Sequence, residues 1–277
     1  MVFDPREPHD GLPLLPPAIE LETRAVLKQC LGATRALAEL KGAGGLIPDQ
    51  TILINSIPLQ EAKLSLGDRE HRYHGGEVLL EMLDNLEVFM LAEEGPDPLV
   101  RMAVAHYQFE AIHPFTDGNG RTGRILNLLY LIHARLLEIP VLYLSRFIIQ
   151  NKAEYYRLLR SVTETGAWEE WLLYMLRGVQ ETALWTTNRI RAIRDLFDAT
   201  VGQTRRELPR IYSKELIEMI FRQPYCKIQF LVDAGIAKRQ TASVYLQELE
   251  RIGLLTSERR GKEVIYKHPA LLEVLIA

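Results

Sequence analysis

The chain has 277 residues, 47% of them hydrophobic and 25% charged, and its formal net charge is −3. This composition is ordinary for a soluble globular protein, and the length suggests about two domains. The small negative charge gives no general attraction to nucleic acid. The start lacks a secretory signal pattern and the most apolar window is broken by polar residues, so we expect neither export nor membrane insertion.

Cysteine usage points to the compartment. Cys30 and Cys226 lie far apart in the sequence and fit no metal-binding or disulfide pattern. Proteins without disulfides are typical of a reducing environment. We therefore expect a cytoplasmic protein.

The first two hundred residues have helical periodicity almost throughout. Residues 23–40 form an Ala- and Leu-rich pattern, and residues 76–91 carry an apolar face. Asp97 and Pro98 suit the cap and first position of a third helix. On that helix we interpret His106 as a packing residue or as a support for the site.

The most specific feature is the run HPFTDGNGRTGR at residues 113–124. Apolar residues recur at helical spacing after it, so a helix begins close to Gly120 and its first unpaired N–H groups point back at the glycine loop. Gly118 and Gly120 have no Cβ, which lets main-chain amides approach phosphate oxygens. This stretch therefore predicts an anion site, which the helix dipole favours further.

The charged residues of the run extend this prediction. Arg121 and Arg124 lie three positions apart, and we expect them on one helix face, gripping further phosphates. Asp117 is the carboxylate of the run, and one carboxylate with phosphate oxygens and water is typical of Mg²⁺. His113 is the group there that can take a proton near neutral pH.

The run matches every defined position of the Fic family signature, HPFxDGNGRxxR, and most members of that family transfer AMP from ATP to a protein hydroxyl. Further stretches resemble bacterial Fic proteins with a C-terminal winged helix, and these are residues 16–17, 36–40, 105–110, 143–146 and 155–157. The resemblance covers nearly the whole chain. It implies a mostly α fold, with a Fic-type helical bundle followed by a small winged-helix domain.

The resemblance also implies a mechanism. A Ser, Thr or Tyr hydroxyl of a target protein attacks the α-phosphorus of Mg²⁺-bound ATP, and pyrophosphate leaves. His113 takes the hydroxyl proton, Asp117 holds the metal, and the two arginines bind the β- and γ-phosphates. The residues expected to bind the nucleotide within the run are Gly118, Asn119, Gly120, Arg121, Thr122, Gly123 and Arg124.

Three residues outside the run match the family stretch that lines the adenine. They are Asn151, Tyr155 and Tyr156. For either tyrosine a place in the helix core is an equally good interpretation. Phe115, inside the run, is expected to point into the core and anchor the loop.

One segment departs from the family pattern. Many Fic proteins carry a regulatory Ser-x-x-x-Glu helix, due here between Glu61 and Glu77. The position four after Ser65 is Arg69, and Glu70 comes one residue late, which rotates it by roughly 100° on a helix. We therefore expect no inhibitory glutamate and little of the target-docking flap, unless residues have been lost from this segment.

A long helical region runs from residue 171 to about residue 200, and polar residues then mark a boundary. We place a Fic domain at residues 1–203 and a second domain at residues 204–277. The second domain has helical patterns at 213–221, 226–233 and 239–252 and strand patterns at 254–257 and 263–266. This order is typical of a winged helix.

The second domain leaves a DNA-binding role open. From residue 211 onward there are ten Lys or Arg and eight Asp or Glu, so the net charge is only +2. DNA recognition needs several phosphate contacts, and dimerisation or target presentation is an alternative role. The residues in question are Gln240, Ser243 and Gln247 on the last helix and Arg259, Arg260 and Lys262 on the hairpin.

The sequence is compatible with three functions. The leading one is an AMP transferase that uses ATP and Mg²⁺, acts on a hydroxyl of a protein, itself included, and forms a homodimer. The second is an enzyme of the same fold that uses another nucleotide donor or removes AMP. The third is a DNA-binding regulator with an accessory Fic domain.

Overall fold

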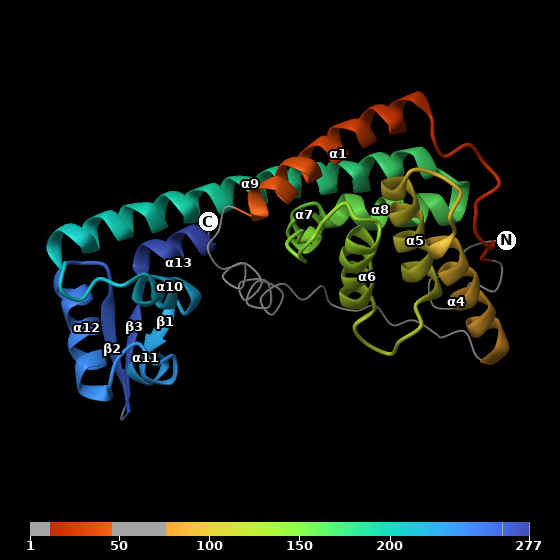
Figure 1. Ribbon diagram of the computed structural model, residues 1–277. Coiled ribbons are helices and arrows are strands. Elements are labelled where there is room, and N and C mark those ends of the chain that lie inside the picture. Colours follow the sequence, from red (N-terminus) through yellow and green to blue (C-terminus); the bar gives the residue numbers. More distant parts are fainter. Residues whose placement is uncertain (1–11, 46–75, 262, 277) are drawn as a thin grey trace. The chain divides into compact units, whose positions relative to one another are not determined.

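The computed structural model describes residues 12–45, 76–261 and 263–276 (Figure 1). The described residues form two compact units, residues 12–41 with 76–186 and residues 42–45 with 187–261 and 263–276. The helices of the first unit, the last of which continues into the second, are α1 (Arg24–Gly44), α4 (Gly76–Leu91), α5 (Pro98–Ile112), α6 (Asn119–His133), α7 (Leu144–Gln150), α8 (Lys152–Thr165) and α9 (Trp168–Glu207). The mostly α fold expected from the sequence is confirmed.

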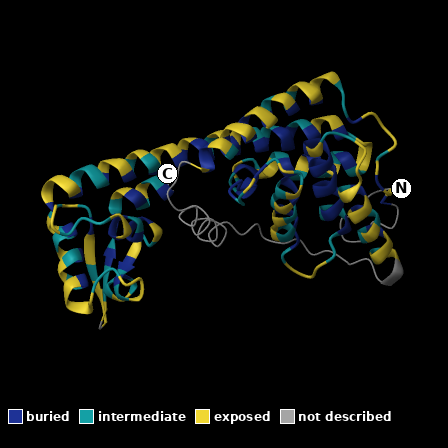
Figure 2. Ribbon diagram, in the orientation of Figure 1, coloured by how far each residue is buried: buried dark blue, intermediate teal, exposed yellow. Residues whose placement is uncertain are grey.

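Helix α5 lies in the core of the first unit, and most of its residues are buried (Figure 2). It begins as expected, with the Asp97 carboxylate accepting the N–H of Leu99 at 2.8 Å and Pro98 at the first position. Its buried Arg101 donates to the main-chain carbonyls of Ala92 and Glu94. Arg101 thereby joins α5 to the loop that follows α4.

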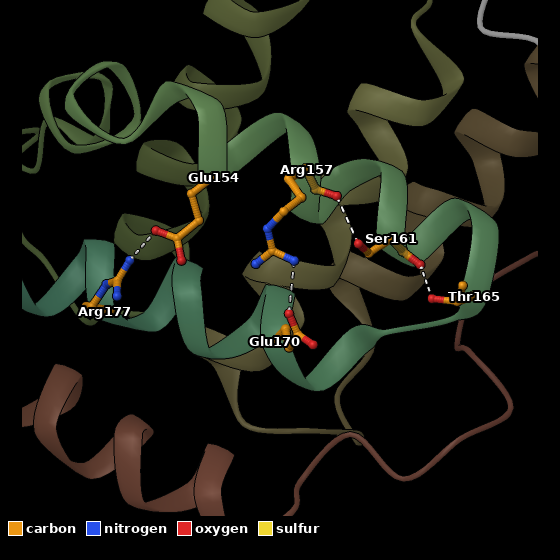
Figure 3. A network of polar contacts seen from close by, with 6 residues as sticks. All are labelled: Glu154, Arg157, Ser161, Thr165, Glu170 and Arg177. Atoms are coloured by element: carbon orange, nitrogen blue, oxygen red, sulfur yellow. Dashed lines mark hydrogen bonds and ion pairs between the residues drawn. The ribbon is translucent and has the colours of Figure 1, made fainter.

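Helices α8 and α9 are joined by two ion pairs at the surface (Figure 3). The Glu154 carboxylate lies 2.7 Å from the Arg177 guanidinium, and the Glu170 carboxylate lies 3.3 Å from the Arg157 guanidinium. Such exposed pairs contribute about 0–1 kcal/mol each. They therefore add little stability beside the apolar packing of the two helices.

Within the described part of the second unit, the end of α9 is followed by shorter helices and a small sheet. The later elements are α10 (Lys214–Arg222), β1 (Tyr225–Lys227), α11 (Ile228–Asp233), α12 (Arg239–Arg251), β2 (Thr256–Arg260), β3 (Glu263–Lys267) and α13 (Pro269–Ile276). The antiparallel sheet has the order β1-β3-β2, and β2 and β3 form the hairpin. This arrangement is consistent with a winged helix.

Two boundaries differ from those expected. Helix α9 continues through the polar residues 202–206, because buried Thr204 bonds back to Thr200 and Gln203 donates to the Ile252 carbonyl at 3.0 Å. The first residues of the helix predicted at 226–233 belong instead to β1, which pairs with β3. Tertiary partners thus override the local pattern at both places.

Helix α9 contributes side chains to the core of the second unit. The rings of Phe197 and Phe221 pack edge to face, with centroids 5.1 Å apart. The Arg189 guanidinium donates to the carbonyl of Leu275 at 2.7 Å, near the end of α13. The division between the two compact units falls at residues 186/187, inside α9. The domain boundary at 203/204 stays a prediction from the sequence.

None of the helices that the structure describes is long and apolar enough to cross a bilayer.

Candidate active site

His113 ends α5 in a left-handed backbone conformation, with φ 52° and ψ 57°. Its N–H donates to the carbonyl of Phe109 at 3.0 Å. A residue with a Cβ adopts this conformation at some energetic cost, so the surrounding structure must impose it. The turn takes the chain out of α5 and begins the loop of the motif, with the half-buried imidazole at its start.

Asn119 fixes the shape of that loop. Its side chain is fully buried, with Oδ1 accepting the N–H of Phe115 at 2.9 Å and Nδ2 donating to the carbonyl of Phe115 at 2.6 Å. Both ends of the amide are therefore engaged inside the protein. An Asn119 contact to the nucleotide stays a prediction, and it would have to come from the main-chain N–H.

Gly118 precedes α6 in the left-handed region, with φ 86°. A Cβ there would be strained and would stand 3.3 Å from the Arg121 guanidinium. The Gly118 carbonyl accepts both the N–H and the hydroxyl of Thr122, at 2.9 and 3.1 Å. The first turn of α6 has no acidic side chain, so no carboxylate of that turn competes for its N–H groups. Binding of a phosphate there stays a prediction.

The exposed charges of the motif are Asp117 and Arg121. The carboxylate and guanidinium lie 3.3 Å apart, and the Arg121 side chain is 60% exposed. An exposed pair of this kind exchanges partners at little cost, so both groups are accessible to a bound nucleotide or cation. Among the described residues no cluster of three His, Cys, Asp or Glu could hold a metal, so a cation at Asp117 would need phosphate oxygens and water as further ligands.

Arg124 has very different surroundings from Arg121. It is only 6% exposed, and its Nη1 lies 3.0 Å from the point where a Gly120 Cβ would stand. The carboxylate of Glu110 on α5 is 3.8 Å from the same point. The two arginines thus differ in burial, and their expected common grip on the phosphates stays a prediction.

Gly123 is also buried, where α6 faces α5. A Cβ on it would stand 2.9 Å from Glu110 Oε1 and 3.2 Å from both His106 Cε1 and Phe109 Cδ1. The absent side chain lets α5 and α6 approach closely. A contact between Gly123 and the nucleotide stays a prediction.

His106 is a core residue, in line with its expected packing role. Its Nε2 lies 3.0 Å from the Tyr155 hydroxyl, its Nδ1 lies 3.1 Å from the Asn127 amide nitrogen, and its ring stacks on Trp171. Burial, together with the positive charge of Arg124, lowers the pKa of His106 from 6.5 to about 3. The imidazole is therefore neutral at physiological pH.

The residues expected at the adenine differ among themselves. Tyr155 is buried, and burial raises the pKa of its hydroxyl well above 10, which is the environment of a core aromatic. Asn151 joins α7 to α8, and its side chain donates to the Phe147 carbonyl at 2.9 Å. Tyr156 is half-buried beside Lys152, whose ammonium lies 6.0 Å from the ring centroid. Adenine contacts by these three residues stay predictions.

The sequence interpretation missed one residue and misplaced another. The missed residue is Glu110, whose Oε1 lies within 4 Å of the Cβ positions of both Gly120 and Gly123. The sequence feature that could have indicated it is a carboxylate three residues before His113 in a mostly buried helix. Phe115, expected in the core, is 47% exposed, with its ring centroid 6.3 Å from that of Phe109. The amide of Asn119, rather than the ring of Phe115, anchors the loop.

In the second unit, carboxylates pair with several basic residues of the sheet. Glu258 pairs with Arg260 at 3.0 Å and also with Lys267, and Glu263 pairs with Lys227 at 2.6 Å. On α12, Gln240 and Gln247 are exposed and Ser243 is half-buried. Lys262 lies outside the described residues, as do Ser65, Arg69, Glu70 and most of the segment between Glu61 and Glu77.

Two family models match the chain. Residues 46–131 match the Fic/DOC family, and residues 196–271 match the C-terminal domain of SoFic-like protein adenylyltransferases. The segment that holds the motif therefore belongs to the Fic/DOC family. The first match contains the whole motif together with α5, and the second covers most of the unit that follows.

Named relatives also match part of the chain. The protein adenylyltransferase fic-1 of Caenorhabditis briggsae is 41% identical over 85 residues, which are 30% of this chain and 16% of the relative. The protein adenylyltransferase fic-1 of Caenorhabditis elegans is 48% identical over 63 residues, which are 23% of this chain and 11% of the relative. A probable protein adenylyltransferase of Aquifex aeolicus is 27% identical over 132 residues, 48% of this chain and 38% of the relative. The chain thus spans well under half the length of these Fic proteins.

One further match is a solved structure. A Fic family protein from Desulfovibrio desulfuricans matches with 18% identity and a TM-score of 0.36, over 90% of this chain and 77% of that one.

Proposed function

We propose that this protein transfers AMP from ATP to a hydroxyl group of a protein. The observation that carries the proposal is the direct succession of His113, held in its left-handed turn, and the glycine-framed start of α6. This succession joins a proton acceptor to an anion site within one short loop. The matches to relatives named protein adenylyltransferases support the same activity.

The residues fit a magnesium-bound triphosphate. The amides of the first α6 turn would receive the α-phosphate, and Gly118 and Gly120 leave the space it needs. Arg121 and Arg124 would bind the phosphates beyond it. Asp117 would hold Mg²⁺, which when bound neutralises charge on the phosphate oxygens.

The reaction then follows from the loop. The target hydroxyl oxygen attacks the α-phosphorus, the bond from that phosphorus to the bridging oxygen breaks, and pyrophosphate leaves with the bonding electrons. His113 takes the hydroxyl proton at its imidazole. The arginines stabilise the charge that grows on the leaving group.

Isotope placement tests this proposal. Protein incubated with Mg²⁺ and ATP labelled at the α-phosphate should acquire label on itself or on proteins of a lysate, whereas ATP labelled at the γ-phosphate should leave none. Label from the γ-phosphate would indicate phosphoryl transfer, and label from neither position would remove the proposal. Competition with unlabelled CTP and GTP would show whether the donor is specifically ATP.

A regulator that acts only through DNA is not favoured. Glu258 pairs with Arg260 and Lys267 of the hairpin, and Glu263 pairs with Lys227 of β1, which reduces the positive charge available to DNA. A homodimer and a cytoplasmic location stay predictions from the sequence.

A further inference from the structure

Glu110 stands at the junction of the two helices that build the site. It lies in the last turn of α5, three residues before His113. Its Oε1 lies within 4 Å of the Cβ positions of both Gly120 and Gly123, and less than 1 Å² of that atom is accessible to solvent. A carboxylate oxygen thus lies beside the first turn of α6, where two absent side chains leave room for it.

Arg124 reaches the same place from α6. One of its terminal nitrogens stands 3.0 Å from the Gly120 Cβ position, and the residue is nearly fully buried. Taking a guanidinium out of water costs several kcal/mol unless a counter-charge and hydrogen bonds compensate. The fold therefore has to supply an anion close to Arg124.

The described side chains around this point identify that anion. His106 is kept neutral by burial and by Arg124 itself, and Tyr155 is kept neutral by burial. Phe109 carries no charge. Glu110 supplies the carboxylate among these side chains. Its negative charge raises the pKa of Tyr155, whereas the positive charge of Arg124 lowers it.

We propose that Glu110 is a positioning residue for Arg124. Its carboxylate holds the buried guanidinium so that a terminal nitrogen stays beside Gly120, at the start of α6, where the last phosphate of a triphosphate is bound. The inference rests on the proposed function, because that function requires a triphosphate at this loop. Its consequence is that Glu110, which does not touch the nucleotide, sets how strongly the site prefers ATP to ADP.

The preference for ATP is the quantity to measure. Dissociation constants for ATP and ADP, each with Mg²⁺, would be determined by calorimetry for the wild type, Glu110→Gln, Arg124→Gln and the double variant. Because neighbouring residues in one polar network are energetically coupled, Glu110→Gln should reduce the ATP-to-ADP preference by about tenfold. The double variant should have the same preference as Arg124→Gln alone.

Two further variants separate positioning from simple structural support. Glu110→Asp keeps the charge on a shorter side chain and should restore part of the preference, which also serves if Glu110→Gln folds poorly. Glu170→Gln removes a carboxylate that pairs with an arginine of the same unit, outside the motif, and should leave the preference unchanged.

The outcomes are distinct. If wild-type protein binds ATP but Glu110→Gln keeps the wild-type preference, or if its effect adds fully to that of Arg124→Gln, the role of Glu110 is refuted and the proposed function stands. If the wild type binds no ATP, the proposed function and this inference both fail.

Discussion

The motif contains two arginines that differ in what surrounds them. Arg121 is mostly exposed and pairs with Asp117, whereas Arg124 is buried beside Glu110 and the neutral ring of His106. An exposed guanidinium can adjust to a ligand, and a buried one is held in place before the ligand arrives. The first therefore suits a phosphate whose position varies, and the second suits a fixed one.

The close approach of α5 and α6 depends on Gly123. In Gly123→Ala the new methyl group would meet three buried neighbours at 2.9 to 3.2 Å, and overpacking of this kind costs about 1–3 kcal/mol. Urea denaturation should show that loss. Gly42→Ala is the control, because nothing lies within 4 Å of that Cβ in α1, and it should be neutral or slightly stabilising. Equal stability of the two variants would show that the helices can separate freely.

His106 predicts a pH dependence of stability. Its pKa is about 3 in the folded protein against 6.5 ordinarily, so as the pH falls the unfolded state takes up the proton first. Stability should decline from about pH 6.5 downward, by about 2 kcal/mol for this residue at about pH 5. Denaturation midpoints of the wild type and His106→Gln at about pH 7.5 and pH 5 test this. The variant should lose less stability, and an identical loss in both proteins would exclude His106 as the source.

At the scale of elements, the site is the connection between α5 and α6. The left-handed residues His113 and Gly118 turn the chain at either end of the loop. The Asn119 side-chain amide joins the loop to the start of α6 by bonding to the main-chain N–H and carbonyl of Phe115. No other residue type offers a short donor and acceptor in this arrangement. The loop is therefore shaped before any nucleotide binds.

Asn119→Ala should disturb this connection. It leaves the N–H and carbonyl of Phe115 without their side-chain partner, which typically costs about 1–3 kcal/mol, and it should reduce AMP transfer more than ATP binding because His113 loses its support. Asn119→Asp keeps the acceptor but loses the donor, so an intermediate defect is expected. Transfer at the wild-type rate in the Ala variant would mean that the loop is shaped by other contacts.

Much of this arrangement could be predicted from the sequence. Helical periodicity located the main helices, and the start of α6 lies within one residue of Gly120, where it was expected, because both depend on local spacing. The burial of Arg124, the part played by Glu110 and the exposure of Phe115 could not be predicted, since they depend on how α5 packs against α6. Strand β1 was missed for the same reason, because its pairing partner β3 comes some forty residues later.

At the scale of the whole molecule, the chain divides into two units inside α9. Residues of α9 after 186, such as Phe197, pack against α10 of the second unit. The motif and every residue expected to bind the nucleotide belong to the first unit. Loss of packing in the second unit should therefore leave nucleotide binding intact.

Phe197→Ala tests this division. Removing a buried aromatic ring costs about 3–5 kcal/mol, so the second unit should become sensitive to protease while ATP affinity stays at the wild-type value. Limited proteolysis and calorimetry on the same sample would measure both. A parallel loss of ATP affinity would show that the two units are not independent in the way the fold suggests.

The central claim is that His113 acts as the base in transfer of AMP. Intact-mass spectrometry after incubation with ATP and Mg²⁺ tests it most directly, with wild-type protein and His113→Ala compared at equal ATP occupancy. We predict that the wild type gains the mass of one or more AMP groups, and that the variant gains them at least 10²-fold more slowly, because loss of a general base costs about 10²- to 10⁴-fold. Labelling of His113→Ala at the wild-type rate would contradict the claim.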